Sequence, residues 1–444
     1  MRLYNTLSKK KEDFVPLVKD TVTIYYCGMT LQESPHIGHV RAVLTADILH
    51  RYLKYLGYNV KLIVNFTDID DKVIRKAKEE RKDYREIASY YETEYREVTR
   101  ALNILEPSFS PRATQHIEEI IKLIENLEKK GFAYQKDGDV FFRVRKFKDY
   151  GKLSGKKIDE LRSGVRIEVN EKKEDPLDFA LWKKGEPSEP FWFSPWGKGR
   201  PGWHIECSSM AIHYLGETID IHGGGTDLIF PHHENEIAQS ESATGKPFAR
   251  FWIHNGMLNI KGEKMSKSLF NFIPIKDLLR EYDPNVIRLY LLQAHYRNPI
   301  DYAPELLQQA ASAWEKIINF LKISEGRKGN LIPEIIKAFE ERMNDDLGTP
   351  EAIALMFNLI NEGLKEEEKI GSYRETLFLI LQVLGFKPIE KETALKPLID
   401  EILTLRKELR KEGNYKVADQ IREVLLKIGI IVQDDKEGSR WWIR

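Results

Sequence analysis

The chain has 444 residues, of which 42% are hydrophobic and 31% are charged. This predicts a globular protein of roughly two to four domains. No apolar run approaches the roughly 18 residues that a membrane span needs, and the first residues lack the apolar segment of a secretory signal. The net charge of zero neither favours nor excludes nucleic acid, because a local basic surface matters more than the total. We expect a cytoplasmic protein without a membrane partner, acting as a monomer.

The first hundred residues alternate between strand and helix patterns. A run of β-branched and aromatic residues at 21–26 predicts a buried strand, and 58–66 predicts a second one. A helix is expected over 42–55, and the stretch 70–102 is helical throughout. Strand, helix, strand, helix is the order of a doubly wound parallel sheet, so we predict a Rossmann-like α/β fold.

The pattern then changes in a way that indicates an insertion into the sheet. An amphipathic helix is expected over 114–130 and a hairpin over 132–145, with Asp137-Gly138 at its turn. Residues 151–200 are rich in Gly, Pro and Trp and show little periodicity. Strand patterns return at 218–222 and 251–255, so the insertion splits the predicted sheet.

We divide the chain into six regions on these grounds. Beyond about Pro304 the sequence is almost wholly helical, and a boundary near Pro388 precedes helix 418–428, a strand at 430–432 and a Trp-rich end. The regions are the first half of the sheet domain at 1–105, the insertion at 106–202, the second half at 203–255, a connecting region at 256–305, a helical bundle at 306–387 and a small C-terminal α/β unit at 388–444.

Two short motifs suit phosphate groups. Pro35-His36-Ile37-Gly38-His39 lies between the first strand and its helix, where backbone N–H groups and the helix dipole attract anions. Gly38 allows close backbone approach, and both histidines can donate to developing charge. Lys264-Met265-Ser266-Lys267-Ser268 places two lysines in a loop, as a polyphosphate requires. The alternatives are two surface histidines in a turn and an ordinary solvated loop.

Together, in this order, the two motifs resemble the signatures of class I aminoacyl-tRNA synthetases. The resemblance implies that His36, His39, Lys264 and Lys267 are catalytic. It implies ATP, used with Mg²⁺, as a substrate. The glycine-rich end of the later strand extends the expected ATP site, whose members are Gly38, His222, Gly223, Gly224, Asp227 and Lys267.

A third constellation joins the chain's two cysteines, Cys27 and Cys207, to His232-His233-Glu234-Asn235-Glu236. If Pro231 starts a helix, His232 and Glu236 lie at i and i+4 on one face. Two thiolates, one imidazole and one carboxylate make a plausible tetrahedral zinc set. The alternative is two buried structural cysteines and a solvated helix start. Cys27, however, follows a strand at the edge where α/β sheets bind ligands.

The longer sequence around these residues resembles the cysteinyl-tRNA synthetase family over nearly all of the chain. The resemblance is carried by YYCGMTLQESPHIGHVR, NFTDIDDK, GRPGWHIECS, DIHGGGTDLIFPHHENEIAQSE, KMSKSLFNF, DDLGTPEA and ADQIREVLLKIGI followed by GSRWW.

This resemblance implies activation of L-cysteine with ATP and its transfer to tRNA(Cys). It also implies one zinc ion at Cys27, Cys207, His232 and Glu236, which recognises the substrate thiolate, and it selects His232 over His233. Residues 256–305 become a stem-contact region and 388–444 an anticodon-binding unit.

Several residues carry weaker expectations. Thr67 and Trp203 are expected to bind the amino acid, and Asp68 accompanies Thr67. The alternatives are a helix N-cap for the strand-end residues and a core position for Trp203. The tryptophans at 441 and 442 either stack on bases or close a small core.

The sequence departs from the family at two places, and two other functions remain open. Phe270-Asn271 stands where the family has Gly-Asn, which bears on the geometry of the lysine loop. Leu347-Gly348 replaces Phe-Asn, which we interpret as a packing change. The alternative functions are a tRNA-independent ligase that joins cysteine to an amino sugar and a non-catalytic paralogue that binds zinc and tRNA.

Overall fold

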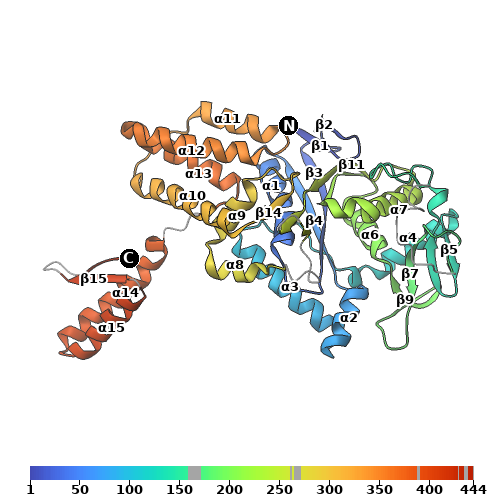
Figure 1. Ribbon diagram of the computed structural model, residues 1–444, viewed down its shortest axis with the longest axis horizontal. Coiled ribbons are helices and arrows are strands. Elements are labelled where there is room, and N and C mark those ends of the chain that lie inside the picture. Colours follow the sequence, from blue (N-terminus) through green and yellow to red (C-terminus); the bar gives the residue numbers. More distant parts are fainter. Residues whose placement is uncertain are drawn as a thin grey trace. The chain divides into compact units, whose positions relative to one another are not determined.

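The computed structural model describes residues 1–158, 172–260, 263–264, 272–387, 391–428, 430–434 and 439–443. The chain forms two compact units, Met1–Phe386 and Lys387–Arg444, which we describe separately (Figure 1). Among the described helices, none combines the length and the apolar character that crossing a membrane requires.

A sheet of four parallel strands forms the centre of the larger unit, in the order β11–β10–β3–β4. The strands are β3 (Thr21–Thr30), β4 (Asn59–Thr67), β10 (Ile219–Gly225) and β11 (Ala249–Asn255). Figure 1 shows helices α1 (Ile37–Tyr55) and α6 (Trp203–Leu215) on opposite sides of these strands. Coverage on both faces explains the nearly continuous burial of the strand residues. The predicted Rossmann-like doubly wound sheet is confirmed.

Two helix predictions need correction. Helix α1 begins at Ile37 rather than near residue 42, because the side chain of His36 caps its N-terminus. The single helix expected over 70–102 is wrong, since α2 (Asp71–Glu80) and α3 (Tyr84–Ala101) are separate helices. Arg81 ends α2 in the left-handed conformation at φ 55°, and the Asp83 carboxylate then caps α3.

The region between the two halves of the sheet forms its own five-stranded antiparallel sheet, in the order β5–β6–β7–β9–β8. The predicted helix and hairpin are confirmed as α4 (Ile117–Lys129) and the pair β5 (Ala133–Lys136) and β6 (Asp139–Phe142). Three strands lie in the stretch that showed little periodicity: β7 (Phe179–Lys184), β8 (Trp192–Ser194) and β9 (Gly197–Pro201).

The remainder of the larger unit is mostly helical, as predicted beyond residue 304. A three-stranded sheet, in the order β13–β12–β14, precedes the bundle. Its strands are β12 (Leu258–Ile260), β13 (Glu263–Lys264) and β14 (Ile300–Tyr302). The helices are α8 (Ile275–Glu281), α9 (Pro284–Leu292), α10 (Pro304–Ile323), α11 (Pro333–Asn344), α12 (Thr349–Lys365) and α13 (Ile370–Val383). Leu347, one of the departures from the family, is buried in the main hydrophobic core.

The N-terminal strands β1 (Arg2–Asn5) and β2 (Lys10–Asp13), which were not predicted, form a small antiparallel hairpin. The smaller unit holds two helices and a second antiparallel pair: α14 (Lys391–Lys411), α15 (Tyr415–Lys427), β15 (Ile430–Asp434) and β16 (Ser439–Ile443). Trp441 packs against the core of this unit, and its indole N–H donates to Asp400 at 3.0 Å. This contact favours the interpretation that Trp441 closes a small core.

A buried carboxylate joins the sheet domain to the helices that follow it. Asp47 on α1 is fully buried and accepts hydrogen bonds from Arg51 at 2.9 Å, from the amide of Leu105 at 2.8 Å and from Arg288 on α9. Arg288 also donates to the carbonyl of Leu384, at the end of α13, at 2.7 Å. The Arg288 side chain therefore ties α9 to α1 and to the end of the last helix of the bundle.

We predict that Asp47→Ala destabilises the protein by about 3–5 kcal/mol, because it leaves the Arg288 guanidinium buried without its anionic partner. Chemical denaturation followed by tryptophan fluorescence measures this change in the free energy of unfolding. Asp277→Ala is the control, since its ion pair with Arg280 is largely exposed and its removal should cost less than about 1 kcal/mol. Equal effects of the two substitutions would contradict the role given to Asp47.

Candidate functional site

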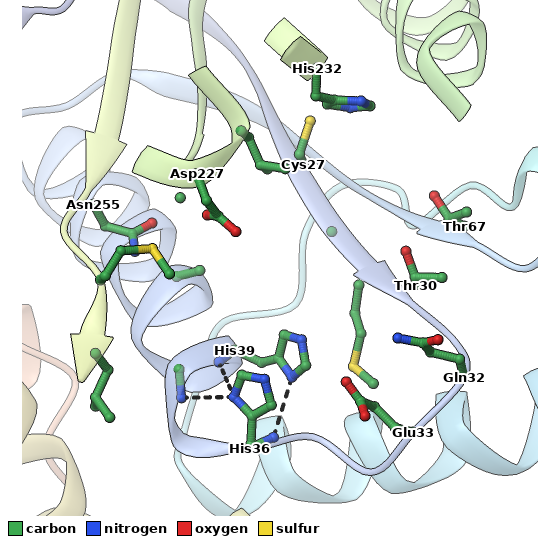
Figure 2. Close-up of a pocket in the computed structure, with 18 of the residues that line it drawn as sticks. Cys27, Thr30, Gln32, Glu33, His36, His39, Thr67, Asp227, His232 and Asn255 are labelled. Atoms are coloured by element: carbon green, nitrogen blue, oxygen red, sulfur yellow. Dashed lines mark hydrogen bonds between the residues drawn. The ribbon is translucent and has the colours of Figure 1, made fainter. Parts of the chain in front are cut away.

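A cavity of about 420 Å³ lies at the carboxyl ends of the parallel strands (Figure 2). Ligands bind at this edge in open α/β sheets. The last residues of β4, β10 and β11 all contribute to its wall. The sequence-predicted residues that line it are Cys27, His36, Gly38, His39, Thr67, Trp203, Cys207, Asp227 and His232.

A β-bulge directs Cys27 into the cavity. The pairing of β3 with β4 shifts between Tyr26 and Met29, so that Cys27 and Gly28 together oppose one residue of β4. The amide of Gly28 donates to the Asn65 side chain at 2.9 Å. A Cβ atom at Gly28 would lie 1.7 Å from the Asn65 carbonyl oxygen, so only glycine fits at this position.

The four predicted metal ligands converge. The sulfur of Cys27 lies 3.8 Å from that of Cys207 and 3.6 Å from Oε1 of Glu236, and Nε2 of His232 lies 3.0 Å from the same oxygen. Tetrahedral zinc with its usual bond lengths gives a sulfur–sulfur separation of about 3.8 Å and a sulfur–oxygen separation of about 3.6 Å. All four residues are buried, and their ligand atoms lie within 4.8 Å of one another. The donor set therefore fits a tetrahedral ion.

The charges of this cluster also suit a cation. A hydrogen bond from the Cys27 thiol holds the pKa of Cys207 at about 6, despite burial. Burial alone would raise the pKa of Glu236, but His222 and His232 hold it at about 2. A thiolate and a carboxylate are thus present at neutral pH, as metal ligation requires.

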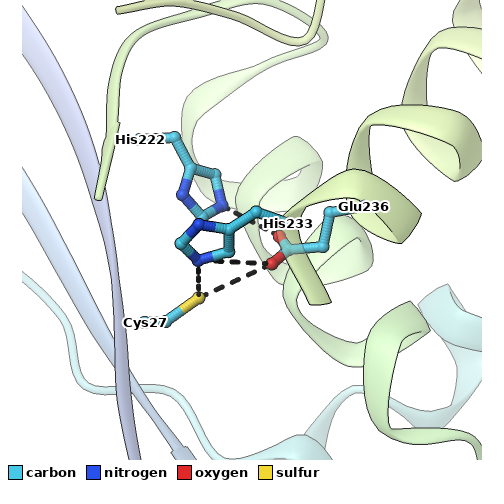
Figure 3. Close-up of side chains that lie close together, drawn as sticks. All are labelled: Cys27, His222, His233 and Glu236. Atoms are coloured by element: carbon cyan, nitrogen blue, oxygen red, sulfur yellow. Dashed lines mark hydrogen bonds and ion pairs between the residues drawn. The ribbon is translucent and has the colours of Figure 1, made fainter. Parts of the chain in front are cut away.

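A second donor set overlaps the first and shares Cys27 and Glu236 with it (Figure 3). Nε2 of His222 lies 2.8 Å from Oε2 of Glu236, and Nε2 of His233 lies 3.4 Å from the sulfur of Cys27. The other ring nitrogen of His233 is held by His254 at 2.8 Å. His222 and His233 are therefore either ligands themselves or the partners that orient two ligands of the first set.

The helix that carries Glu236 follows a kink at Phe230, whose backbone is extended at φ −140° and ψ 131°, and the chain runs from there through His232 and His233 into α7 (Glu234–Thr244). The ring of Trp203 stacks on that of His232 with centroids 4.4 Å apart. Nδ1 of His204 lies 2.9 Å from Nδ1 of His232, which leaves Nε2 of His232 toward Glu236. His204 is not predicted by the sequence, because nothing in the spacing of the motif relates it to His232.

His36 and His39 are fixed as hydrogen-bond donors toward the cavity. Nδ1 of His36 accepts from the amides of Gly38 and His39, at 3.1 and 3.3 Å, and Nδ1 of His39 accepts from the amide of His36 at 3.3 Å. Burial lowers the pKa of His39 well below its usual value, and the neighbouring His36 and Lys72 lower it further. A neutral ring that accepts at Nδ1 carries its proton on Nε2. The pair, which stacks at 3.6 Å, thus offers N–H groups to an anion.

Glu33 approaches these two histidines closely enough to suggest another metal-binding group. The tautomers argue against it, because each Nδ1 is engaged by backbone N–H groups and each Nε2 carries the proton. Lys72, which was not predicted, also lines the cavity and is the one described lysine that does so. Its position near the start of α2 adds a cation to the same wall.

Three residues of the expected ATP site lie beneath the cavity wall. His222, Gly223 and Gly224 are buried in β10 and do not line the cavity. A Cβ atom at Gly223 would lie 2.5 Å from the Tyr26 ring, and one at Gly224 would lie 2.9 Å from the His233 ring. These glycines therefore serve close packing beneath the site. Their place on the wall is taken by Gly225 and by the segment Asn255–Leu258.

The remaining predicted residues divide into three groups. The Thr67 hydroxyl lines the cavity and donates to Glu206 at 3.2 Å. Asp68 does not line it, because its carboxylate accepts from the amide and hydroxyl of Thr114. Lys264 is described only as a backbone position in β13, and Lys267 and the Phe270-Asn271 departure lie outside the described residues.

We predict that both histidines of the capped turn are in the Nε2–H tautomer and that His39 is neutral at pH 7. Long-range ¹H–¹⁵N correlation NMR on the ¹⁵N-labelled chain measures this directly, and His36→Asn and His39→Asn assign the two signals. An Nδ1–H tautomer in either ring would contradict the hydrogen bonds that cap α1.

Family models match most of the chain. The model of the class I (C) tRNA synthetase catalytic domain matches residues 13–312, that of the DALR domain matches 338–386, and that of the cysteinyl-tRNA ligase anticodon-binding domain matches 392–441.

Similar proteins agree over the full length. A cysteine–tRNA ligase of Sulfurihydrogenibium sp. is 45% identical, with 99% of both chains covered, and one of Geobacillus sp. is 48% identical, also with 99% of both covered. A methionyl-tRNA synthetase of Mycobacterium tuberculosis, solved with methionyl-adenylate, has a TM-score of 0.60 at 15% identity. The match covers 82% of this chain and 89% of that one, and it shows the shared fold.

Proposed function

The chain belongs to the cysteine–tRNA ligase family, and we propose that its strand-end cavity activates L-cysteine with ATP before transfer to tRNA(Cys). The observation that carries this proposal is the convergence of Cys27, Cys207, His232 and Glu236 beside the wall that holds His36 and His39. A metal site and an anion site thus share one cavity, as a thiol-bearing amino acid and a nucleotide require.

A tRNA substrate is favoured over the two alternative functions. The anticodon-binding model covers residues 392–441, which a ligase for an amino sugar would not need. The catalytic model covers the two phosphate motifs and the four candidate ligands, which argues against a non-catalytic paralogue. The chain is accordingly a cysteine–tRNA ligase.

Of the two overlapping donor sets, we assign the metal to Cys27, Cys207, His232 and Glu236. Three of these line the cavity, whereas His222 and His233 do not, so a ligand in the cavity reaches this set directly. Two sulfur donors also suit zinc better than one. Zinc bound there would supply a soft acceptor for a thiolate sulfur. His222 and His233 then orient Glu236 and Cys27 through the hydrogen bonds described above.

The remaining residues of the cavity supply binding and charge stabilisation. The Nε2–H groups of His36 and His39 donate to the α-phosphate and to the leaving pyrophosphate as charge develops there. Lys72 adds a cation on the same wall. Lys264 and Lys267 hold the β- and γ-phosphates, with Mg²⁺ accompanying ATP, as the sequence predicts. Thr67 and Trp203 bind the amino acid, and Asp227 faces the adenosine or the amino group.

We expect about one zinc ion per chain, and a matched pair of variants tests which histidine binds it. His232→Gln should lower the zinc content severalfold, because one ligand is lost from the set. His233→Gln should keep most of the zinc, because that ring only orients Cys27. The measurement is inductively coupled plasma mass spectrometry after dialysis against a weak chelator. Loss in His233→Gln with retention in His232→Gln would assign the ion to the other set.

We also predict that the protein rejects serine without an editing site. A thiol ionises near pH 8.5, whereas an alcohol does not ionise in this range, and shape alone separates the two side chains only about 10- to 200-fold. We expect kcat/KM for cysteine to exceed that for serine by about 10⁴-fold in pyrophosphate exchange. His232→Gln should reduce this ratio strongly. A wild-type ratio below about 100-fold would refute recognition through the metal site.

A further inference from the structure

One wall of the cavity is formed by three consecutive residues that follow β11. Gly256, Met257 and Leu258 follow Asn255, the last residue of β11, and line the cavity. Gly256 and Met257 form the short connection to β12, whose first residue is Leu258, and β12 leads on to β13 and Lys264. The position of this connection therefore sets both the shape of the cavity and the base of the lysine loop.

The connection packs against a second segment, residues 295–298, between α9 and β14. The amide of Gly256 donates to the carbonyl of Tyr296 at 2.8 Å, and the carbonyl of Met257 accepts from the amide of Ile300 at 3.0 Å. A Cβ atom at Gly256 would lie 2.5 Å from the carbonyl oxygen of Asn298. The two segments are thus in direct backbone contact, with no space for a side chain between them.

The guanidinium of Arg41 joins both segments. It donates to the carbonyl of Met257 at 3.0 Å, to those of His295 and Tyr296 at 3.3 Å each, and to that of Asn298. The residue is 2% exposed and does not line the cavity itself. Arg41 lies two residues after His39 on α1, about 200° further around the helix axis. One helix therefore carries the anion-binding histidines on its cavity side and this guanidinium on another.

Burying the Arg41 guanidinium costs desolvation free energy that its carbonyl partners offset only in part. Carbonyl oxygens carry only partial charge, so they offset the desolvation of a buried cation less well than a carboxylate does. Burial accordingly lowers the pKa of Arg41 to about 10. Arg288, by comparison, is equally buried but contacts the carboxylate of Asp47. A cation that is held by four carbonyl groups of two segments fixes the distance between those segments.

The second segment is itself held firmly. Asp346, which is fully buried, accepts from the Tyr296 hydroxyl and from Nε of Arg297, at 2.7 Å each. Its backbone carbonyl accepts from Nε2 of His295 at 2.9 Å. Residues 295–297 are therefore anchored to the loop between α11 and α12, and they provide a fixed support on which Arg41 holds the cavity wall.

We propose that Arg41 is a positioning residue for ATP, which sets the wall formed by Gly256, Met257 and Leu258 at a fixed distance from His36 and His39. The inference rests on the proposed function in one respect, namely that ATP occupies this side of the cavity. Cysteine binds at the other side, beside Cys27 and His232, so Arg41 acts on the nucleotide and leaves the amino-acid site unchanged.

Arg41→Lys tests this inference, because lysine keeps the charge but lacks the planar fork that reaches several carbonyl groups at once. We expect the Kd and the KM for ATP to rise about 10- to 100-fold, since displacements near 1 Å have effects of this size. The KM for cysteine and the zinc content should stay within twofold. Equilibrium dialysis with labelled ATP and cysteine-dependent pyrophosphate exchange measure these quantities.

Arg288→Lys is the matched control, because it alters a buried arginine that also contacts carbonyl groups but lies away from the cavity. It should lower Tm without changing the affinity for ATP. If Arg41→Lys does not fold, Gly256→Ala displaces the same wall from the Asn298 side and should weaken ATP binding similarly. Unchanged ATP affinity, or equal losses for ATP and cysteine, would overturn the inference. Absence of exchange in the unmodified chain would instead refute the proposed function, and dialysis would still decide the role of Arg41.

Discussion

One close approach between two strands sets the geometry of the whole site. At Gly28 the backbone of β3 meets that of β4 so closely that a single methyl group would collide with the carbonyl of Asn65. The resulting bulge interrupts the regular alternation of β3 and directs Cys27 out of the sheet. Pairing then resumes at Met29, so the strand continues toward the turn that starts α1. The Cys27 thiol and the histidine turn are therefore placed by the same irregularity.

The side chains around the two cysteines are held by contacts that leave them little freedom to rotate. Glu236 is oriented by His222, His232 stacks on Trp203 and contacts His204 through Nδ1, and His233 is fixed by His254. These contacts extend to the N-terminal hairpin region, since Nδ1 of His254 lies 2.8 Å from the Thr6 hydroxyl. Oriented ligands bind a metal more tightly because less conformational entropy is lost on binding.

The sequence predicted the fold well where periodicity and burial act together. The four parallel strands, the hairpin with Asp137-Gly138 and the amphipathic helix α4 all follow from patterns within a dozen residues. The break at Arg81 was missed, because a left-handed arginine leaves no mark in the hydrophobic pattern. The sequence places the glycines of β10 at a strand end, and only the fold shows that their nearest neighbours include Tyr26 and His233. Lys72 and His204 enter the site through tertiary proximity, which motif spacing does not reveal.

The capped turn changes what the start of helix α1 offers to a ligand. The amides of Gly38 and His39, which an anion would otherwise contact, are already satisfied by the ring of His36. The imidazole of His36 accepts from these amides at Nδ1 and carries its proton on Nε2. The positive end of the helix dipole therefore reaches a ligand through a side-chain N–H group. The ring also extends the donor from the backbone by the length of a side chain. A ligand is thereby held away from the main chain, and it meets rigid donors that need no reorganisation when negative charge appears.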